Sequence, residues 1–221
     1  MLTVKPLYKP PRSMRATLIG MFTAAAVAGT FALSPLPNVE IITFMAFIAG
    51  FLFGSRVGGL VGAFSMFLFS AISPYGSGLG YPFLLATQIV GMSVAGVVGG
   101  LLRRPLQGFK STSFWARYLF GVVGAAVTIF YDIITTIGFM YPVIPLSNFL
   151  SVFIAGIPFT VVHVTSNVIL LAFVAPPVVK SVKTMMGEVE VSSEEVYRVK
   201  STAELEHGEA EGHERATRMH P

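Results

Sequence analysis

The sequence contains no cysteine, a single tryptophan and few charged residues for its length. Without cysteine the chain can form neither disulfides nor thiolate metal sites, and it has no nucleophilic thiol. Only 12% of the 221 residues are charged, which is about half of the usual share. The first 187 positions hold just two acidic residues, Glu40 and Asp132. These shortages exclude several classes of enzyme and argue against a soluble globular domain.

Sequence motifs of common enzymes are missing as well. The first 187 residues contain no HExxH, GxSxG or paired-aspartate motif, and no GxxxxGK[ST] phosphate-binding loop occurs anywhere in the sequence. We therefore expect a protein that is not an enzyme and that holds no metal or cofactor. If it takes part in ATP-driven transport, ATP must be used by another subunit.

What the sequence has in abundance is apolar residues, at 53% of the chain with a mean hydropathy of +0.72. Apolar runs recur from position 16 to position 175, which indicates a membrane protein rather than a cleaved signal followed by a soluble domain. Breaks at proline, glycine and charged clusters divide them into six segments, near 16–33, 39–54, 57–72, 82–102, 114–140 and 148–175. We predict an all-α integral membrane bundle of six transmembrane helices.

The second and third segments are short for a membrane span, which takes about 20 residues. A re-entrant hairpin is the alternative for this pair. It would leave Arg56 near the middle of the bilayer, at a cost of about 2.5–3.5 kcal/mol or more. Two full crossings place Arg56 at a membrane surface, so we favour six spans.

Basic residues predict the orientation of these spans. With the amino terminus inside, every basic residue of the membrane region falls on the cytoplasmic side, and the three external loops contain none. These residues are Lys5, Lys9, Arg12, Arg15, Arg56, Arg103, Arg104, Lys110, Arg117, Lys180 and Lys183. They are spread over separate loops, so we do not expect a nucleic-acid partner. We predict a multi-pass protein of the plasma membrane with both termini in the cytoplasm.

Three parts of the chain follow from this pattern. Residues 1–15 form a cytoplasmic segment, residues 16–177 form the six-helix domain, and residues 178–221 form a charged cytoplasmic tail. The nine remaining acidic residues all lie in that tail, which is polar and poor in aromatic residues. We expect the tail to be partly disordered rather than a second domain.

The fifth and sixth spans each contain polar residues three or four positions apart, so the polar residues of each span lie on one face of its helix. An ionised Asp132 cannot face lipid, so it must face protein or a water-filled cavity, and His163 is the obvious partner. Gln88 lies about two turns into the fourth span, and Asn148 opens the sixth. The alternative is that these groups only join helices by hydrogen bonds. The two faces comprise Thr128, Asp132, Thr135 and Thr136, and Thr160, His163 and Asn167.

The predicted external loops are rich in proline, glycine, tyrosine and asparagine. They lie on the side where the polar residues enter the spans, so we interpret them as a ligand lid that includes Tyr75 and Tyr81. Aromatic residues at an ordinary membrane interface are the alternative. Asn38 can act as a helix N-cap. Glu40 is either a carboxylate that the helix dipole stabilises in the first turn or a contact of the ligand.

Small residues recur every four positions in the first, third and fourth spans, which allows close helix packing in lipid. We expect packing within the chain for Gly58 and Gly62 and for Gly91, Ala95 and Gly99. The row of Ala24, Ala28 and Ala32 in the terminal span is as consistent with docking to a separate membrane subunit as with internal packing.

Over residues 14–177 the chain resembles the substrate-specific S-components of energy-coupling factor (ECF) vitamin transporters. The resemblance rests on the alanine row of the first span, on Pro37–Thr43 running through Phe53–Ala63 into Ser65, and on Tyr81-Pro82 with Gln88, Gly91 and Gly99–Leu102. The charged tail is not a usual part of that pattern.

The resemblance implies a six-helix subunit that binds a vitamin or vitamin precursor near the external face. It implies Asn38, Glu40, Gln88, Asp132, Asn148, His163 and Asn167 as ligand contacts, to which the loop tyrosines and Thr135 are added. It further implies docking of the alanine row on a membrane T-subunit that is coupled to two cytoplasmic ATPases. The polar and aromatic inventory suits a ring-bearing ligand, and overall similarity favours a cobalamin-related or other heterocyclic one.

Two other functions remain open from the sequence. One is a structural membrane scaffold, which also has several short spans and needs no ligand. The other is a stand-alone proton-coupled carrier that uses Asp132 and His163, although we find no clear inverted repeat of the kind common in such carriers.

Overall fold

A computed structural model describes residues 11–74, 76–106, 113–182, 184 and 185. This part of the chain is all helical, which confirms the predicted fold class. Its six α-helices are α1 (Arg12–Leu33), α2 (Ile42–Phe53), α3 (Ser55–Ala71), α4 (Pro82–Leu102), α5 (Phe114–Met140) and α6 (Phe149–Ile169). Two short 3₁₀ turns, η1 (Gly78–Gly80) and η2 (Leu146–Asn148), precede α4 and α6, and the π-helical η3 (Leu170–Val174) follows α6.

Four apolar segments are long enough to cross a membrane, which makes the chain a multi-pass membrane protein. They are Arg12–Leu33, Pro82–Leu102, Phe114–Met140 and Leu146–Val182. The helices α2 and α3 are shorter, with 12 and 17 residues. At 1.5 Å per residue, α2 is only about 18 Å long. The count of six spans and the cytoplasmic position of the termini therefore stay predictions.

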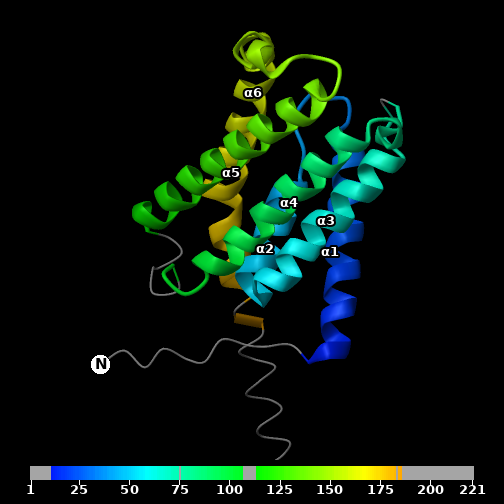
Figure 1. Ribbon diagram of the computed structural model, residues 1–221. Coiled ribbons are helices and arrows are strands. Elements are labelled where there is room, and N and C mark those ends of the chain that lie inside the picture. Colours follow the sequence, from blue (N-terminus) through cyan, green and yellow to red (C-terminus); the bar gives the residue numbers. More distant parts are fainter. Residues whose placement is uncertain (1–10, 75, 107–112, 183, 186–221) are drawn as a thin grey trace, which may run out of the picture. The chain divides into compact units, whose positions relative to one another are not determined.

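The short helix α2 is the core of the fold. Ten of its 12 residues are buried, and it packs against α1, α3 and α4 (Figure 1). Phe47 and Phe51 of α2 contact Phe120 of α5, with ring centroids 5.7 and 5.4 Å apart. A helix that is apolar on all sides needs protein or lipid around it. Here protein surrounds it, and this explains why a segment too short for an ordinary span is still uniformly apolar.

Glycine brings α2, α3 and α4 into backbone contact. A Cβ atom added at Gly96 of α4 would overlap the carbonyl group of Gly58 in α3, and one at Gly62 would overlap the backbone of Met92. Likewise, Gly99 faces the backbone of Phe47 in α2. The predicted internal packing of these small residues is confirmed. Such close approach supplies the dispersion contacts that hold helices together in lipid.

The chain reverses direction between α2 and α3 at a single residue, Gly54. Its φ of +103° lies in a region that residues with a side chain rarely adopt. By contrast, α1 and α2 are separated by an eight-residue connection, positions 34–41. The α1–α2, α3–α4 and α5–α6 connections lie at one end of the helices, which we call the loop end (Figure 1).

The outer helices complete the bundle. Helix α5 packs on α4, and α6 packs on α5. Helix α1 buries Thr23, Ala26 and Thr30 on its inner face. Its alanine row, Ala24, Ala28 and Ala32, is exposed on the opposite face, so these alanines do not serve packing within the described residues.

The predicted tail lies outside the described residues, apart from a few positions up to 185, and so do the four predicted basic positions Lys5, Lys9, Lys110 and Lys183. Apart from Lys180, the described basic residues of the membrane region lie at helix ends opposite the loop end. They are Arg12 and Arg15 in α1, Arg56 in α3, Arg103 and Arg104 after α4, and Arg117 in α5.

Candidate functional site

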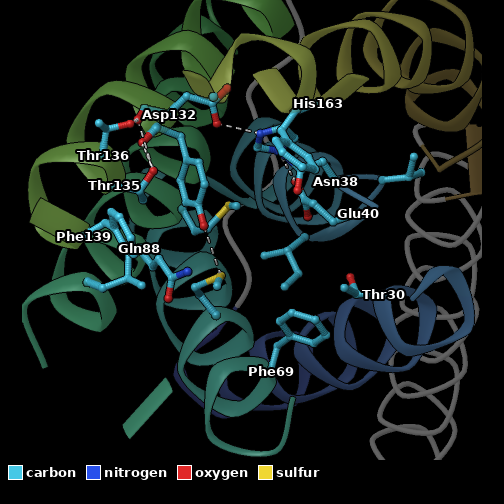
Figure 2. Close-up of a pocket in the computed structure, with 18 of the residues that line it drawn as sticks. Thr30, Asn38, Glu40, Phe69, Gln88, Asp132, Thr135, Thr136, Phe139 and His163 are labelled. Carbon is cyan, nitrogen blue, oxygen red and sulfur yellow. Dashed lines mark hydrogen bonds and ion pairs between the residues drawn. The ribbon is translucent and has the colours of Figure 1, made fainter. Parts of the chain in front are cut away.

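A cavity of about 780 Å³ opens between the helices at the loop end (Figure 2). All six α-helices line it, together with the 34–41 connection. Its volume lies within the range of about 300–1,000 Å³ that is usual for small-molecule sites. The lining is mainly apolar, with polar side chains contributed by several of these elements, as in most sites that enclose an organic ligand.

The cavity exists because α2 starts late. Ile42, the first residue of α2, lines the cavity, while Thr30 and Ser34 line it from the end of α1. The helices around α2 extend further toward the loop end than α2 does (Figure 1), and the connection 34–41 lines the cavity beside the start of α2. The short second segment, which made six spans doubtful from the sequence, thus provides room for a ligand.

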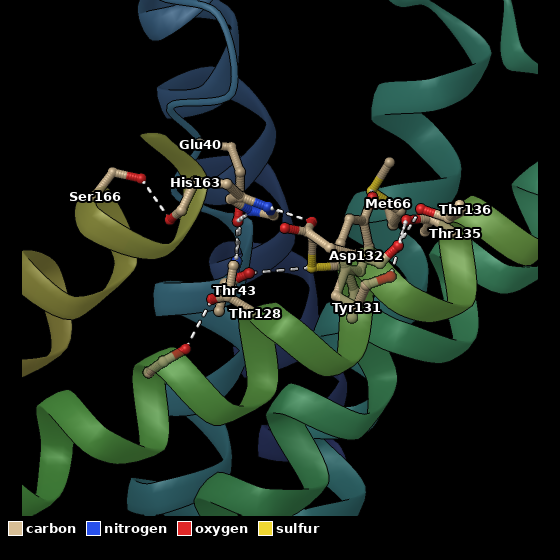
Figure 3. Close-up of polar contacts among 12 residues, drawn as sticks. Glu40, Thr43, Met66, Thr128, Tyr131, Asp132, Thr135, Thr136, His163 and Ser166 are labelled. Carbon is tan, nitrogen blue, oxygen red and sulfur yellow. Dashed lines mark hydrogen bonds and ion pairs between the residues drawn. The ribbon is translucent and has the colours of Figure 1, made fainter. Parts of the chain in front are cut away.

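Three charged side chains meet at this cavity (Figure 3). His163 of α6 places Nδ1 2.8 Å from Oδ1 of Asp132 in α5, and Nε2 3.4 Å from Oε1 of Glu40. Their side chains are 5%, 12% and 14% exposed. Because both ring nitrogens face carboxylate oxygens, the arrangement favours the doubly protonated, cationic ring. The predicted pairing of Asp132 with His163 is confirmed, and Glu40 joins it.

Glu40 also organises the start of α2. Both of its carboxylate oxygens accept hydrogen bonds from the backbone N–H of Thr43, at 3.3 and 3.0 Å. The prediction that Asn38 acts as the N-cap was wrong. Helix α2 begins only at Ile42, and Asn38 is an exposed loop residue with a φ of +56°. Glu40 supplies the oxygen that satisfies a free N–H at the helix start.

Burial raises the pKa of the Glu40 carboxyl. The contact with His163 and the hydrogen bonds from Thr43 act in the opposite direction and prevail, so its pKa lies below the ordinary value of 4.5. Glu40 is therefore a carboxylate at neutral pH. One anionic side chain thereby connects the loop, the start of α2 and the sixth helix.

Other polar side chains of the cavity form contacts within their own helix or with an adjacent helix. The hydroxyl groups of Thr135 and Thr136 donate to backbone carbonyls one turn earlier, including that of Asp132. Gln88 accepts a hydrogen bond of 3.1 Å from Ser70. The rings of Tyr131 and His163 pack edge to face, with centroids 5.5 Å apart. These contacts orient the groups that surround the charged cluster.

The structure brings six of the predicted site residues to the cavity, namely Asn38, Glu40, Gln88, Asp132, Thr135 and His163. Tyr81 and Asn148 do not line it and are exposed near the loop end. Asn167 is fully buried one helical turn beyond His163 and does not line the cavity either. Tyr75 lies outside the described residues.

Three phenylalanines of the cavity escaped notice in the sequence. Phe69, Phe139 and Phe159 line it together with Tyr131. Phe139 stands four positions after Thr135, and Phe159 stands four before His163, so each lies one helical turn from a predicted polar residue. That spacing was the available signal. In a segment that is apolar throughout, it does not distinguish a ligand contact from a lipid contact.

The described fold and cavity define a class of protein, a multi-pass membrane protein with an open cavity of small-molecule size among its helices. A family model described as "ECF-type riboflavin transporter, S component" matches residues 13–184. The chain belongs to this family. No curated protein and no solved structure gives a significant match.

Membership agrees with the resemblance seen in the sequence and makes the chain a substrate-binding subunit of an ECF transporter. It implies a vitamin as substrate, a T-component and an ATPase module as partners, and a subunit that is not itself an enzyme. The preference for a cobalamin-related ligand gains no support, since the family description names riboflavin.

Proposed function

We propose that this chain captures riboflavin in the cavity at the loop end and presents it to an ECF transport complex. The description of the family supports riboflavin as the ligand. The observation that carries the proposal for this chain is a cavity of about 780 Å³ that is lined both by aromatic side chains and by a carboxylate–histidine–carboxylate cluster whose members are at most 14% exposed.

The chemistry of riboflavin suits both parts of that lining. Its flat tricyclic ring system can pack against Phe69, Tyr131, Phe139 and Phe159. Its imide N–H and its ribityl hydroxyl groups are hydrogen-bond donors, which Glu40 and Asp132 can accept. We propose Asn38, Gln88, Thr135 and His163 as further contacts, because they line the same cavity.

Titration of the purified protein with riboflavin, followed by quenching of flavin fluorescence, tests this function. We expect saturable binding, and we expect Asp132→Ala to weaken it at least about tenfold, because the variant removes a charged hydrogen-bond acceptor. Ser166→Ala is the matched control on α6, since Ser166 contacts the backbone of His163 but does not line the cavity. Binding of cobalamin but not riboflavin, or full binding by Asp132→Ala, would contradict the proposal.

We further propose that the exposed alanine row of α1 is the docking face for the T-component. Ala24, Ala28 and Ala32 share one face of the helix and leave room for a second helix to approach closely. None of them lines the cavity. Ligand capture and docking therefore use different surfaces of the same subunit.

A further inference from the structure

Three aromatic side chains form an exposed cluster at the start of α5. Phe114, Trp115 and Tyr118 are 73%, 62% and 54% exposed. The rings of Phe114 and Tyr118 stack with centroids 6.4 Å apart, and the ring of Trp115 meets both of them edge on, at 5.9 and 6.1 Å. None of the three lines the cavity. Neither ligand capture nor packing among the described helices therefore accounts for this cluster.

The length of α5 places the cluster near the surface of the membrane. At 1.5 Å per residue its 27 residues span about 40 Å, against about 30 Å for the hydrocarbon core of a bilayer. At the usual tilt of about 20° the helix is still longer than the core. Tryptophan and tyrosine favour the layer of lipid headgroups, where an apolar ring and a polar tip are both accommodated. The first turn of α5 therefore lies among headgroups rather than between acyl chains.

The same end of the bundle has an excess of positive charge. Helices α4 and α5 pack against each other and run in opposite directions, so Arg104 after α4 and Arg117 in α5 lie at the same end (Figure 1). Both side chains are exposed. In the described part of the chain the acidic residues are Glu40 and Asp132, and both contact His163 at the loop end. No described carboxylate therefore offsets the charge of these arginines.

An anionic phospholipid matches both parts of this surface. A guanidinium group can donate two parallel hydrogen bonds to a phosphate, and Arg117 stands three positions after Phe114, so the two are neighbours on the helix. The rings offer an apolar surface to the glycerol backbone and the first methylene groups of the acyl chains. Aromatic rings alone would also hold the trimethylammonium group of a zwitterionic lipid. The arginines repel that cation, so the surface favours a headgroup with net negative charge.

We propose that Phe114, Trp115 and Tyr118 form, with Arg104 and Arg117, a binding site for the headgroup of an anionic phospholipid such as phosphatidylglycerol. The site lies at the opposite end of the helices from the cavity and needs neither riboflavin nor the transport partners. A lipid bound there holds the start of α5 at the membrane surface. The sequence predicts this surface to be the cytoplasmic one, where anionic lipids attract basic segments.

Trp115 is the only tryptophan of the chain, so its fluorescence reports on this site alone. The test reconstitutes the full-length protein into vesicles of phosphatidylglycerol and phosphatidylcholine in equal amounts. Dibrominated acyl chains, which quench tryptophan on contact, are carried by one lipid or by the other. We expect the relative affinity for phosphatidylglycerol to exceed that for phosphatidylcholine at least about fivefold at low salt. Raised ionic strength should bring this ratio closer to one.

Single substitutions separate a specific site from general attraction by positive charge. Arg117→Gln should lower the preference at least about twofold, and adding Arg104→Gln should lower it further, while Trp115 remains as the reporter. Arg12→Gln is the matched control and should leave the preference unchanged. Arg12 is also exposed and lies at the same end, but it belongs to α1, which packs on α2 and α3.

Two results would overturn the lipid site. Equal quenching by the two brominated lipids in the wild type would mean that the rings rest in any lipid or contact a protein partner instead. An equal loss of preference in Arg12→Gln and Arg117→Gln would mean that only the overall charge of this end attracts anionic lipid.

Discussion

At the scale of residues, Glu40 has two structural roles in addition to its proposed contact with the ligand. Its carboxylate accepts a hydrogen bond from the backbone N–H of Thr43 at the start of α2, and it contacts Nε2 of His163 in α6. The loop and the sixth helix are thus connected through one carboxylate. Its pKa lies below 4.5 because these contacts prevail over burial.

The direction of this pKa shift predicts how stability depends on pH. A carboxyl group whose pKa is lowered by folding stabilises the fold above its ordinary pKa, and this contribution is lost as the pH falls through the folded-state value. At pH 7 we expect Glu40→Gln to be less stable than the wild type by about 1.5–3 kcal/mol, the usual range for hydrogen bonds to charged groups.

Thermal melts of both proteins in the same detergent measure the effect. The difference in melting temperature should be constant from pH 7 to about pH 5, and should shrink below 4.5. A difference that grows as the pH falls would contradict this account of Glu40.

At the scale of elements, the distinctive feature is that α2, α3 and α4 touch through their backbones. Glycines make this possible, and they hold a 12-residue helix in the centre of the bundle. The cavity depends on this arrangement, because the start of α2 contributes to its lining.

Gly96→Ala should therefore destabilise the protein and weaken ligand binding. The new methyl group would overlap the carbonyl group of Gly58 and push α3 and α4 apart, at about 1–3 kcal/mol for overpacking. Gly20→Ala in α1 is the matched control, because a Cβ atom there meets nothing within 4 Å. Melting temperatures of the two variants provide the comparison, and equal values would contradict the packing argument.

At the scale of the whole molecule, the chain carries the proposed ligand site at the loop end and an exposed row of small residues along α1. Family membership implies a T-component and an ATPase module as partners. Transport by this protein is therefore expected to need partners, whereas ligand capture is not.

Ala28→Trp should prevent assembly with the T-component and stop uptake without changing riboflavin affinity. A bulky ring on this face blocks close approach of another helix. Val122→Trp is the control, since Val122 is 47% exposed on a different helix. Co-purification and vesicle uptake measure the two effects. Uptake by the chain alone, driven by a pH gradient, would instead indicate the stand-alone carrier.

Much of the fold could be predicted from the sequence, because a helix in lipid needs a run of apolar residues and ends where polar residues, proline or glycine interrupt that run. The predicted segments 82–102 and 114–140 coincide with α4 and α5. The isolation of Asp132 in an apolar region also pointed to the cavity and to a partner, since a carboxylate in such surroundings needs one. His163 was recognisable as that partner because it is the only histidine of the apolar region.

Only the tertiary structure decided how the segments combine. The sequence did not reveal that α2 is enclosed by other helices, that Glu40 joins the charged pair, or that Asn167 lies beneath the cavity and not in it. Helical spacing defines which residues share a face. Which face meets which depends on how the helices pack and on the path of the 34–41 connection. Those are set by contacts between residues more than a hundred positions apart, such as Glu40 and His163.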